Sequence, residues 1–306
     1  RYTPGTPKPR KISGVPNVVA KGQGGLLDLA LHPDFDTTPW VYISYSAPDG
    51  ADKATTAVSR YKLKGDALVD GEEIFRASPG VKTRHHYGSR LTFDREGYLF
   101  ITVGDRGRRD DHPQYLSNHC GKVHRIHDDG RIPADNPFIT KAGAQKSIYS
   151  YGHRNPQGMA LHPETGQIWA HEHGPRGGDE LNRIQKGLNY GWPVISYGIN
   201  YSGTTFTELT AQQGMEQPEL YWVPSIAPSG MSFVAGDRYP GWKGDIMAGS
   251  LRFKYLNRID MDGEIVVGEE LLLKNIGRVR NVQQGPDGYI YVAIEKPGAI
   301  LRILPG

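Results

Sequence analysis

The sequence predicts an all-β protein: a six-bladed β-propeller with four-stranded antiparallel blades, forming a single domain over residues 1–306. Two observations lead to this fold class. The chain of 306 residues contains 39 glycines and 22 prolines, spread evenly, which is typical of many short strands joined by turns. A loose repeat also runs along the whole chain, and no long amphipathic helical pattern interrupts it.

Each copy of the repeat consists of a turn, an acidic residue, and then alternating aromatic and aliphatic residues. The copies begin at His32, Phe93, His162 and Gly285, with a degraded copy at Tyr239. A second unit follows most copies, a strand with a basic residue that runs into a turn, as in KVHRIHDDGRIP and LNRIDMDGEI. The copies lie about 50–75 residues apart, close to the length of a propeller blade with variable loops. In a propeller, the ligand site lies at one mouth of the central channel, in loops between blades.

Composition excludes several classes of protein. The net charge is +3, without a long basic run or basic residues interleaved with aromatic ones, so a nucleic-acid partner is not expected. No apolar run approaches the roughly 18 residues of a membrane span. Cys120 is the single cysteine, which excludes an intrachain disulfide and a cysteine-built metal site. The chain begins at Arg1 without an apolar signal core, so we expect a periplasmic or secreted protein whose signal peptide has been removed; a chain shortened for other reasons is the alternative.

The segment HGPRGGDELNRIQKGLNYGWP, from His173 to Pro193, has no helical or strand period. Its glycines let main-chain carbonyls reach positions that a Cβ would close. Asp179 and Glu180 place hard oxygen ligands beside them. Carbonyls together with carboxylates are the ligands that calcium prefers, so the segment predicts a calcium site; an acidic surface turn is the alternative.

A second segment, RHHYGSRLTFDREGYLFITVGDRGR, suggests a general base. His86 precedes one expected strand and Asp105 follows the next, and an antiparallel hairpin returns these two ends to the same rim. A carboxylate that fixes the tautomer of a histidine is the usual support for a base. A purely structural histidine is the alternative. His85 is expected to point the other way, because adjacent strand residues face opposite sides.

Other polar residues interrupt the repeat. Arg154 precedes the turn at Asn155, so a rigid bend presents its guanidinium to an oxyanion or carboxylate, or ties two blades together. Arg278 and Arg280 share one strand face, and their mutual repulsion hints at a polyanionic ligand between them; a solvated basic strand is the alternative. Gln23 lies in a glycine-rich entry to a strand, and by itself it is weak evidence for a binding site.

Seven motifs in one order connect the chain to a known family: GQGGLLDLALHPDF, HHYGSRL, GDRGR, GHRNPQGMA, EHGPRGGDE, NYGWP and IAPSGM. Together they resemble the soluble aldose dehydrogenases that depend on pyrroloquinoline quinone (PQQ), the group that includes soluble glucose dehydrogenase. The resemblance extends from about Val15 to Ile303. It implies a six-bladed propeller, in agreement with the interpretation of the repeat.

The resemblance also implies roles for particular residues. His86 would take the proton of the C1 hydroxyl of the sugar while hydride passes to PQQ, Asp105 would support His86, and Arg154 would stand by the quinone oxygen. The residues implied to hold PQQ are Gln23, Arg154, Asn155, Ser225, Arg252, Arg278 and Arg280. Arg252 and Ser225 depart from the Lys and Thr of the glucose dehydrogenases, and long insertions of those enzymes are missing here.

Two calcium ions are implied as well. One would be bound by the carbonyls of Gly174 and Pro175 together with PQQ. A second, structural ion would take the side chain of Glu180 and the carbonyl of Tyr190, with Ser196 and Asn200 as weaker candidates. His173 replaces the glutamine that precedes the Gly-Pro pair in the glucose enzymes.

The expected protein is therefore a PQQ- and calcium-dependent aldose dehydrogenase that oxidises the anomeric hydroxyl of a small-molecule aldose to a lactone and passes electrons to an unknown acceptor. Two alternatives remain: a calcium-dependent propeller hydrolase acting on lactones, and a non-catalytic propeller that binds another protein. Neither has a use for Arg252, Arg278 and Arg280 around one polyanion, so these arginines discriminate among the three.

Overall fold

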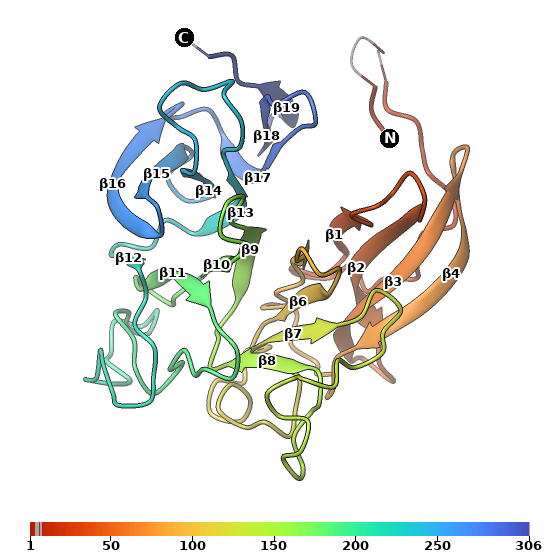
Figure 1. The fold of residues 1–306 in the computed structure, drawn as a ribbon. Helices are drawn as coiled ribbons and strands as arrows, with labels where there is room; N and C mark the ends of the chain where they lie inside the picture. Colours follow the sequence, from red (N-terminus) through yellow and green to blue (C-terminus); the bar gives the residue numbers. More distant parts are fainter. Residues whose placement is uncertain (4–5, 7, 306) are drawn as a thin grey trace.

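The protein is described by a computed structural model that covers residues 1–3, 6 and 8–305, and all of its regular elements are β-strands (Figure 1). In the first sheet the strands are β1 (Leu26–Leu31), β2 (Trp40–Pro48), β3 (Ala54–Lys64) and β4 (Ala67–Arg76). In the second they are β5 (Leu91–Phe93), β6 (Leu99–Val103), β7 (Lys122–Ile126) and β8 (Ile148–Tyr151).

The remaining strands form three more sheets. The third contains β9 (Pro156–Leu161), β10 (Ile168–Glu172), β11 (Asp179–Ile184) and β12 (Leu220–Trp222). The fourth contains β13 (Pro228–Phe233), β14 (Ile246–Ser250), β15 (Leu256–Asp262) and β16 (Ile265–Leu272). The fifth contains β17 (Arg278–Gln284), β18 (Ile290–Glu295) and β19 (Ala299–Arg302). Within every sheet the strands pair in chain order and antiparallel.

The prediction of six four-stranded blades is wrong: the described residues form five sheets, four of four strands and one of three. The number of sheets equals the number of repeat copies, because each copy supplies the second strand of one sheet, namely β2, β6, β10, β14 and β18. The described residues before β1 add no sheet of their own. There Ser13 forms a single bridge to Ala67 at the start of β4.

Apolar side chains fill the spaces between consecutive sheets. Tyr42 and Phe75 of the first sheet pack with Leu99 of the second, and Phe100 of the second sheet packs with Ile168 of the third. Equivalent clusters join the third sheet to the fourth and the fourth to the fifth. The alternation of aromatic and aliphatic residues in each repeat copy therefore serves this packing, at about 1.5–3 kcal/mol for each fully buried large side chain.

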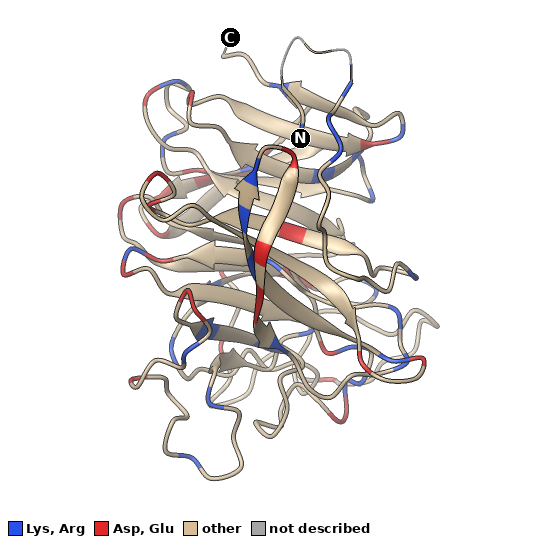
Figure 2. Ribbon diagram, turned by 90° about the vertical axis from the view of Figure 1, so that its right-hand side faces the viewer, with Lys and Arg blue, Asp and Glu red and all other residues tan. Residues whose placement is uncertain are grey.

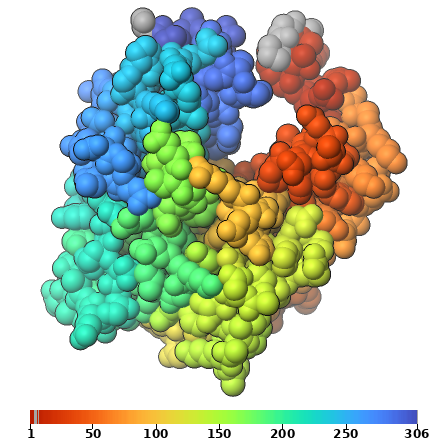
Figure 3. All heavy atoms as spheres, in the orientation of Figure 1, coloured from red at the N-terminus to blue at the C-terminus, as the bar shows by residue number. Residues whose placement is uncertain are grey.

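The innermost strands of the five sheets, β1, β5, β9, β13 and β17, surround a cavity of about 1130 Å³. The ring of sheets is open between the fifth and the first, as the space between the C-terminal and N-terminal parts of the surface shows (Figure 3). Charged residues of both signs lie mostly in the loops at the two ends of the sheets (Figure 2). In the part of the chain that the structure describes, no helix has the length and apolar character to cross a membrane.

Antiparallel pairing determines where the loops go. The loop that enters each innermost strand and the loop that leaves the second strand of the same sheet lie at the same end of the sheet. This end carries the predicted site residues.

Candidate active site

Five predicted residues occupy equivalent positions in the five sheets, in the loop entering the innermost strand or at its first residue. They are Gln23, His86, Asn155, Ser225 and Arg278. Asp105, Gly174 and Arg252 follow the second strands of three sheets. Residues far apart in sequence are therefore brought to one mouth by the repetition of the sheet.

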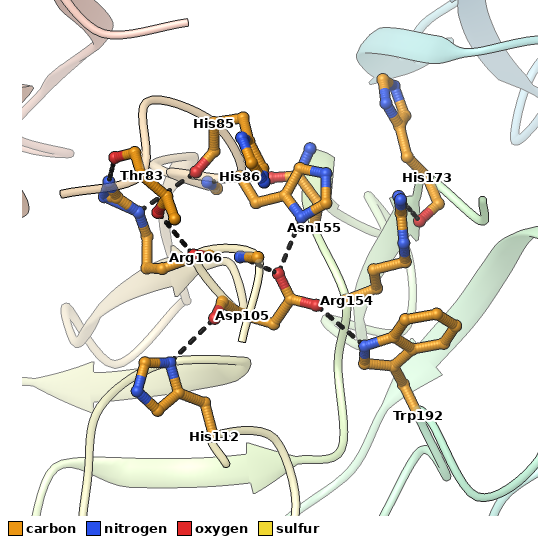
Figure 4. A network of polar contacts seen from close by, with 12 residues as sticks. Thr83, His85, His86, Asp105, Arg106, His112, Arg154, Asn155, His173 and Trp192 are labelled. Atoms are coloured by element: carbon orange, nitrogen blue, oxygen red, sulfur yellow. Dashed lines mark hydrogen bonds and ion pairs between the residues drawn. The ribbon is translucent and has the colours of Figure 1, made fainter. Parts of the chain in front are cut away.

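His86 and Asp105 lie in contact, as the hairpin argument predicts. The His86 Nδ1 atom is 2.7 Å from Asp105 Oδ1 (Figure 4). A carboxylate accepts hydrogen bonds, so Nδ1 carries the proton and Nε2 keeps its lone pair. His86 itself has φ of 56°, in the left-handed region that few non-glycine residues adopt, and this backbone turn aims the ring at the carboxylate.

Asp105 is 1% exposed and has two further donors. The Gly107 amide donates to Oδ1 at 2.7 Å, and the Trp192 indole Nε1 donates to Oδ2 at 2.9 Å (Figure 4). Trp192 belongs to the quoted motif NYGWP, but nothing in that motif indicates a partner 87 positions earlier in the chain. The carboxylate is thus held from both sides in a fixed orientation.

The protonation states follow from this environment. Burial lowers the pKa of His86 to about 4. The hydrogen bond to Asp105 raises this pKa, and the positive charge of Arg154 lowers it further. Burial alone would raise the pKa of Asp105, but the bond to His86, the charge of Arg154 and the Gly107 amide hold it below its usual value. At neutral pH the pair is a neutral imidazole beside a carboxylate, the state that a general base requires.

Arg154 lies over the indole ring of Trp192. Its guanidinium carbon is 5.3 Å from the centroid of the indole ring, and its Nη1 donates to the carbonyls of His173 and Gly174 at 3.0 and 2.8 Å. The Asp105 amide also donates to the Arg154 carbonyl at 2.7 Å. These contacts connect the second sheet to the third and fix the guanidinium close to the His86–Asp105 pair.

A cavity of about 650 Å³ opens on this pair. Its lining includes Gln23, His85, His86, Arg154, Trp192 and Asn200. The expectation that His85 points away is wrong, because this stretch is a loop rather than a strand and the strand alternation does not apply. The His85 ring packs edge-on against that of His86, with centroids 4.5 Å apart.

A second cavity, of about 680 Å³, adjoins the first at Gln23. Its lining includes Asn155, His173, Arg252, Arg278 and Arg280. The Gln23 Oε1 atom accepts from the His86 amide at 2.7 Å and the Asn155 Oδ1 atom accepts from the Gly88 amide at 3.1 Å. Both amide side chains therefore hold the loop that carries His86.

The two neighbouring guanidiniums do have an anion between them. Arg278 Nε donates to Glu295 at 3.1 Å and Arg280 Nε donates to the same carboxylate at 2.6 Å. Arg252 donates to the Ser225 carbonyl at 3.2 Å and forms no ion pair within the described residues. Three guanidiniums thus line a cavity with a single carboxylate between two of them, which leaves an excess of positive charge.

Two of the predicted site residues, Ser225 and Asp179, are hydrogen-bonded to each other. Ser225 donates its hydroxyl to Asp179 at 2.6 Å, and the amides of Gly174 and Ala227 each donate to the same carboxylate at 2.8 Å. Asp179, which the sequence offers as a hard ligand, therefore organises the loop that presents Gly174 and Pro175.

Glu180 lies opposite Glu172 in the pairing of β10 with β11. Burial and the repulsion of Glu172 and Asp179 raise the pKa of Glu180 to about 8, and Asn182 is its hydrogen-bond donor at 3.3 Å. A carboxyl group in such a place is stabilised as an anion when a cation binds. In the described residues no three His, Cys, Asp or Glu side chains group to hold a metal.

The other predicted ligands of the structural ion all lie in the long segment between β11 and β12. The Tyr190 ring stacks on His153, with centroids 4.6 Å apart, and His153 binds Glu172, the cross-strand partner of Glu180. Ser196 accepts from the Gly198 amide at 3.0 Å. The Asn200 Oδ1 atom accepts from Arg109 at 2.8 Å and lines the cavity of His86.

Comparison with known proteins agrees with this geometry. The sequence model described as Glucose / Sorbosone dehydrogenase matches residues 2–302. The chain belongs to this family. The resemblance inferred from the seven motifs is thereby confirmed, and with it the dehydrogenase class of the protein.

Relatives are similar over most of the chain. The aldose sugar dehydrogenase YliI of Escherichia coli is 45% identical over 300 residues, which cover 96% of this chain and 81% of the relative. Quinoprotein glucose dehydrogenase B of Acinetobacter calcoaceticus is 32% identical, over 77% of this chain and 53% of the relative.

Solved structures are similar as well. The soluble aldose sugar dehydrogenase of Escherichia coli, in its apo form, superposes with a TM-score of 0.93 at 44% identity, covering 96% of this chain and 86% of the other. A PQQ-bound aldose sugar dehydrogenase of Streptomyces coelicolor superposes with a TM-score of 0.76 at 28% identity, covering 95% and 83%. The five sheets of this family member therefore have close structural counterparts.

Proposed function

We propose that this protein is a PQQ-dependent aldose dehydrogenase that oxidises the anomeric hydroxyl of an aldose to a lactone and uses calcium. The observation that carries the proposal is the neutral His86 on ionised Asp105, facing one cavity together with Arg154, while a second cavity lined by arginines adjoins it. The relatives named as aldose sugar dehydrogenases, one of them PQQ-bound, support the choice of reaction.

The residues around the second cavity fit PQQ, which carries three carboxylates. Arg252, Arg278 and Arg280 outnumber Glu295, and a guanidinium binds a carboxylate through two parallel hydrogen bonds. Gln23 lines both this cavity and that of His86, and Asn155 lines this one, so their amide nitrogens are placed to donate to a bound polar ligand. When bound, PQQ supplies the hydride acceptor.

The residues of the chain supply the proton chemistry. We infer that His86 Nε2 accepts the proton of the anomeric hydroxyl, and that Asp105 stabilises the imidazolium that results. Arg154, held by two carbonyls, offers fixed positive charge to an oxygen that becomes negative. Trp192 donates to Asp105, whose carboxylate is buried.

Among the proposed calcium ligands, Glu180 is the best supported. Its buried carboxyl lacks a cationic partner within the described residues, and bound calcium would supply one. The carbonyls of Gly174 and Pro175 would bind the other ion. The Gly174 carbonyl also accepts a hydrogen bond from Arg154.

Reconstitution tests the proposed function directly. Purified protein is incubated with PQQ and CaCl₂ and mixed with each of a panel of aldoses and a reducible dye, and the sugar product is identified as lactone or acid. We expect the dye to be reduced only when both PQQ and CaCl₂ have been added. Absence of dye reduction with every aldose, under conditions in which PQQ is bound, contradicts the proposal; hydrolysis of added lactones would favour the hydrolase alternative.

The bond between Trp192 and Asp105 leads to a further prediction. Replacing Trp192 by Phe keeps a ring under Arg154 but removes the donor to Oδ2, and a hydrogen bond to a charged group is worth about 1.5–3 kcal/mol. The carboxylate then attracts the His86 proton more strongly, so the acidic limb of the kcat/KM profile moves to higher pH and kcat falls. The pH–rate profiles of the two proteins measure this.

Trp222→Phe is the matched control, because the Trp222 indole donates to Glu269 at 2.6 Å in another part of the ring. It loses the same kind of bond and some stability, without a shift of the acidic limb. An unshifted limb in Trp192→Phe, or equal shifts in both variants, contradicts a positioning role for Trp192.

Calcium should stabilise the fold through Glu180. An ion that binds only the folded state adds about 2.7 kcal/mol at 100 times its Kd, so chelation lowers Tm and CaCl₂ restores it. Glu180→Gln should lose most of this response, while Glu208→Gln, the same change on an exposed loop residue, should keep it. Thermal unfolding with and without chelator measures the response; full calcium stabilisation of Glu180→Gln would place the ion elsewhere.

A further inference from the structure

A third cavity lies on the rim beside the proposed PQQ site. It measures about 360 Å³, and its charged lining residues are Lys21, Lys53, Lys82, Arg84 and Asp52. They come from three separate loops: the entry to β1, the turn between β2 and β3, and the segment between β4 and β5. Three stretches of the chain thus bring four cations and one carboxylate to one place.

The four cations around this cavity are not neutralised by neighbouring carboxylates of the described chain. Lys21, Lys53, Lys82 and Arg84 are exposed and form no ion pair within the described residues. At the neighbouring mouth, by contrast, Arg108 is paired with Asp111. Asp49, whose carboxylate lies against Gly80, is a second acid near this cavity. The cations remain in excess, so the rim attracts negative charge from solution.

The third cavity also adjoins the second. Tyr87 is 2% exposed and lines both of them. The Arg84 carbonyl accepts a hydrogen bond from the Gln23 amide at 2.7 Å, and Gln23 lines the second cavity as well. Lys21, Lys53, Lys82 and Arg84 together form the basic rim. Only one layer of residues separates this basic rim from the proposed PQQ site.

We propose that this basic rim is the docking surface for an acidic redox protein that takes the electrons. The inference rests on the proposed function, since oxidation of an aldose to a lactone releases two electrons and two protons. Two molecules of an oxidised one-electron carrier become reduced in each turnover, and the protons pass to solvent. Because all four cations are exposed, a small anion would gain little from them, whereas a surface of several carboxylates gains from all of them and is steered to the rim.

Charge reversal tests the docking surface with a defined acceptor, oxidised plastocyanin, an acidic copper protein. Lys53→Glu/Lys82→Glu should lower kcat/KM for plastocyanin about 10-fold or more at low ionic strength, where steering is strongest. Rates with a small dye should not change, because neither lysine lies in the His86 cavity. With cytochrome c, a basic haem protein, the double variant should be faster than the wild type.

Lys64→Glu is the matched control for the single change Lys53→Glu, since both variants lower the net charge by the same amount. Lys53 precedes β3 and Lys64 ends it, so the two lie roughly 35 Å apart at opposite ends of one strand. Lys64→Glu should leave kcat/KM for plastocyanin near the wild-type value. Equal effects of the rim and control variants, or no effect of the double variant, overturn the proposal, because the attraction then belongs to the net charge of the protein or to another surface.

A binding measurement separates this proposal from the proposed function. Plastocyanin immobilised on a sensor should bind the wild-type protein more tightly than the double variant at low salt, whether or not PQQ is present. Dye reduction reports on the dehydrogenase activity alone. Loss of the binding difference sinks the docking surface even if dye reduction is normal, and absence of dye reduction with a clear binding difference sinks the proposed function instead.

Discussion

His86→Ala lowers kcat by about 10²–10⁴-fold, the usual contribution of a general base, while PQQ still binds. The expectation follows from the geometry: His86 Nδ1 is bonded to Asp105 at 2.7 Å, which leaves Nε2 to accept a proton. Because the base acts in the transition state, kcat and kcat/KM should fall together. Steady-state kinetics after reconstitution with PQQ and calcium measure both.

The pH profile gives the same prediction a second readout. Burial lowers the pKa of His86 to about 4, so the imidazole is neutral and competent at neutral pH and is lost as the pH falls through this value. Wild-type kcat/KM should therefore decline only on the acidic side. His86→Ala removes the titrating group, and its residual activity should lack that limb.

Two neighbouring variants check the assignment. Asp105→Asn keeps a hydrogen-bonding group but not the charge that stabilises the imidazolium, so its kcat should lie between those of the wild type and His86→Ala. His85→Ala should affect kcat far less, since the His85 ring packs against His86 without a carboxylate partner. If His85→Ala were the more damaging change, the base would be His85, and if neither mattered the dehydrogenase mechanism would have to be abandoned.

Arg278→Ala and Arg280→Ala each weaken PQQ binding by about 10- to 100-fold. Each change removes a charge-assisted hydrogen bond to a carboxylate, at about 1.5–3 kcal/mol. Fluorescence titration of the apo-protein with PQQ measures the affinity without any turnover. Arg131→Ala breaks a similar but exposed ion pair, with Asp129, and should leave the affinity unchanged.

A change at Glu295 should also alter PQQ affinity, because its carboxylate accepts hydrogen bonds from both guanidiniums. Its carboxylate competes with the carboxylates of PQQ for the same donors, so Glu295→Gln should bind PQQ more tightly than the wild type. Unchanged affinity in both arginine variants would make these residues ordinary parts of the surface. Weaker binding by Glu295→Gln would mean that Glu295 orients the arginines rather than competing for them.

Local pattern was sufficient for the fold class and for much of the site. The five repeat copies mark the second strands of all five sheets, because alternating side chains must fill the space between neighbouring sheets. His86 and Asp105 lie at the two ends of one hairpin. This position predicts their contact, since antiparallel strands return to the same rim. Both inferences need only pairing between strands that are close in sequence.

The number of sheets differs from the six blades that were expected both from the repeat and from the resemblance. Five copies are present, and the expectation of six blades added a sheet that the described residues do not form. The segment before β1 contributes a bridge to β4 through Ser13 instead. A count of repeat copies would have predicted the five sheets correctly.

By itself, the sequence determined the all-β architecture, the identity of the repeat strands and the mouth at which the polar residues gather. Only the tertiary structure decided that Trp192 holds Asp105, that Glu295 lies between two arginines and that Asp179 is saturated by protein donors. Those contacts join different sheets or different loops, so no period or spacing along the chain encodes them. They depend on how sheets pack around a common channel, and that packing is a property of the whole fold.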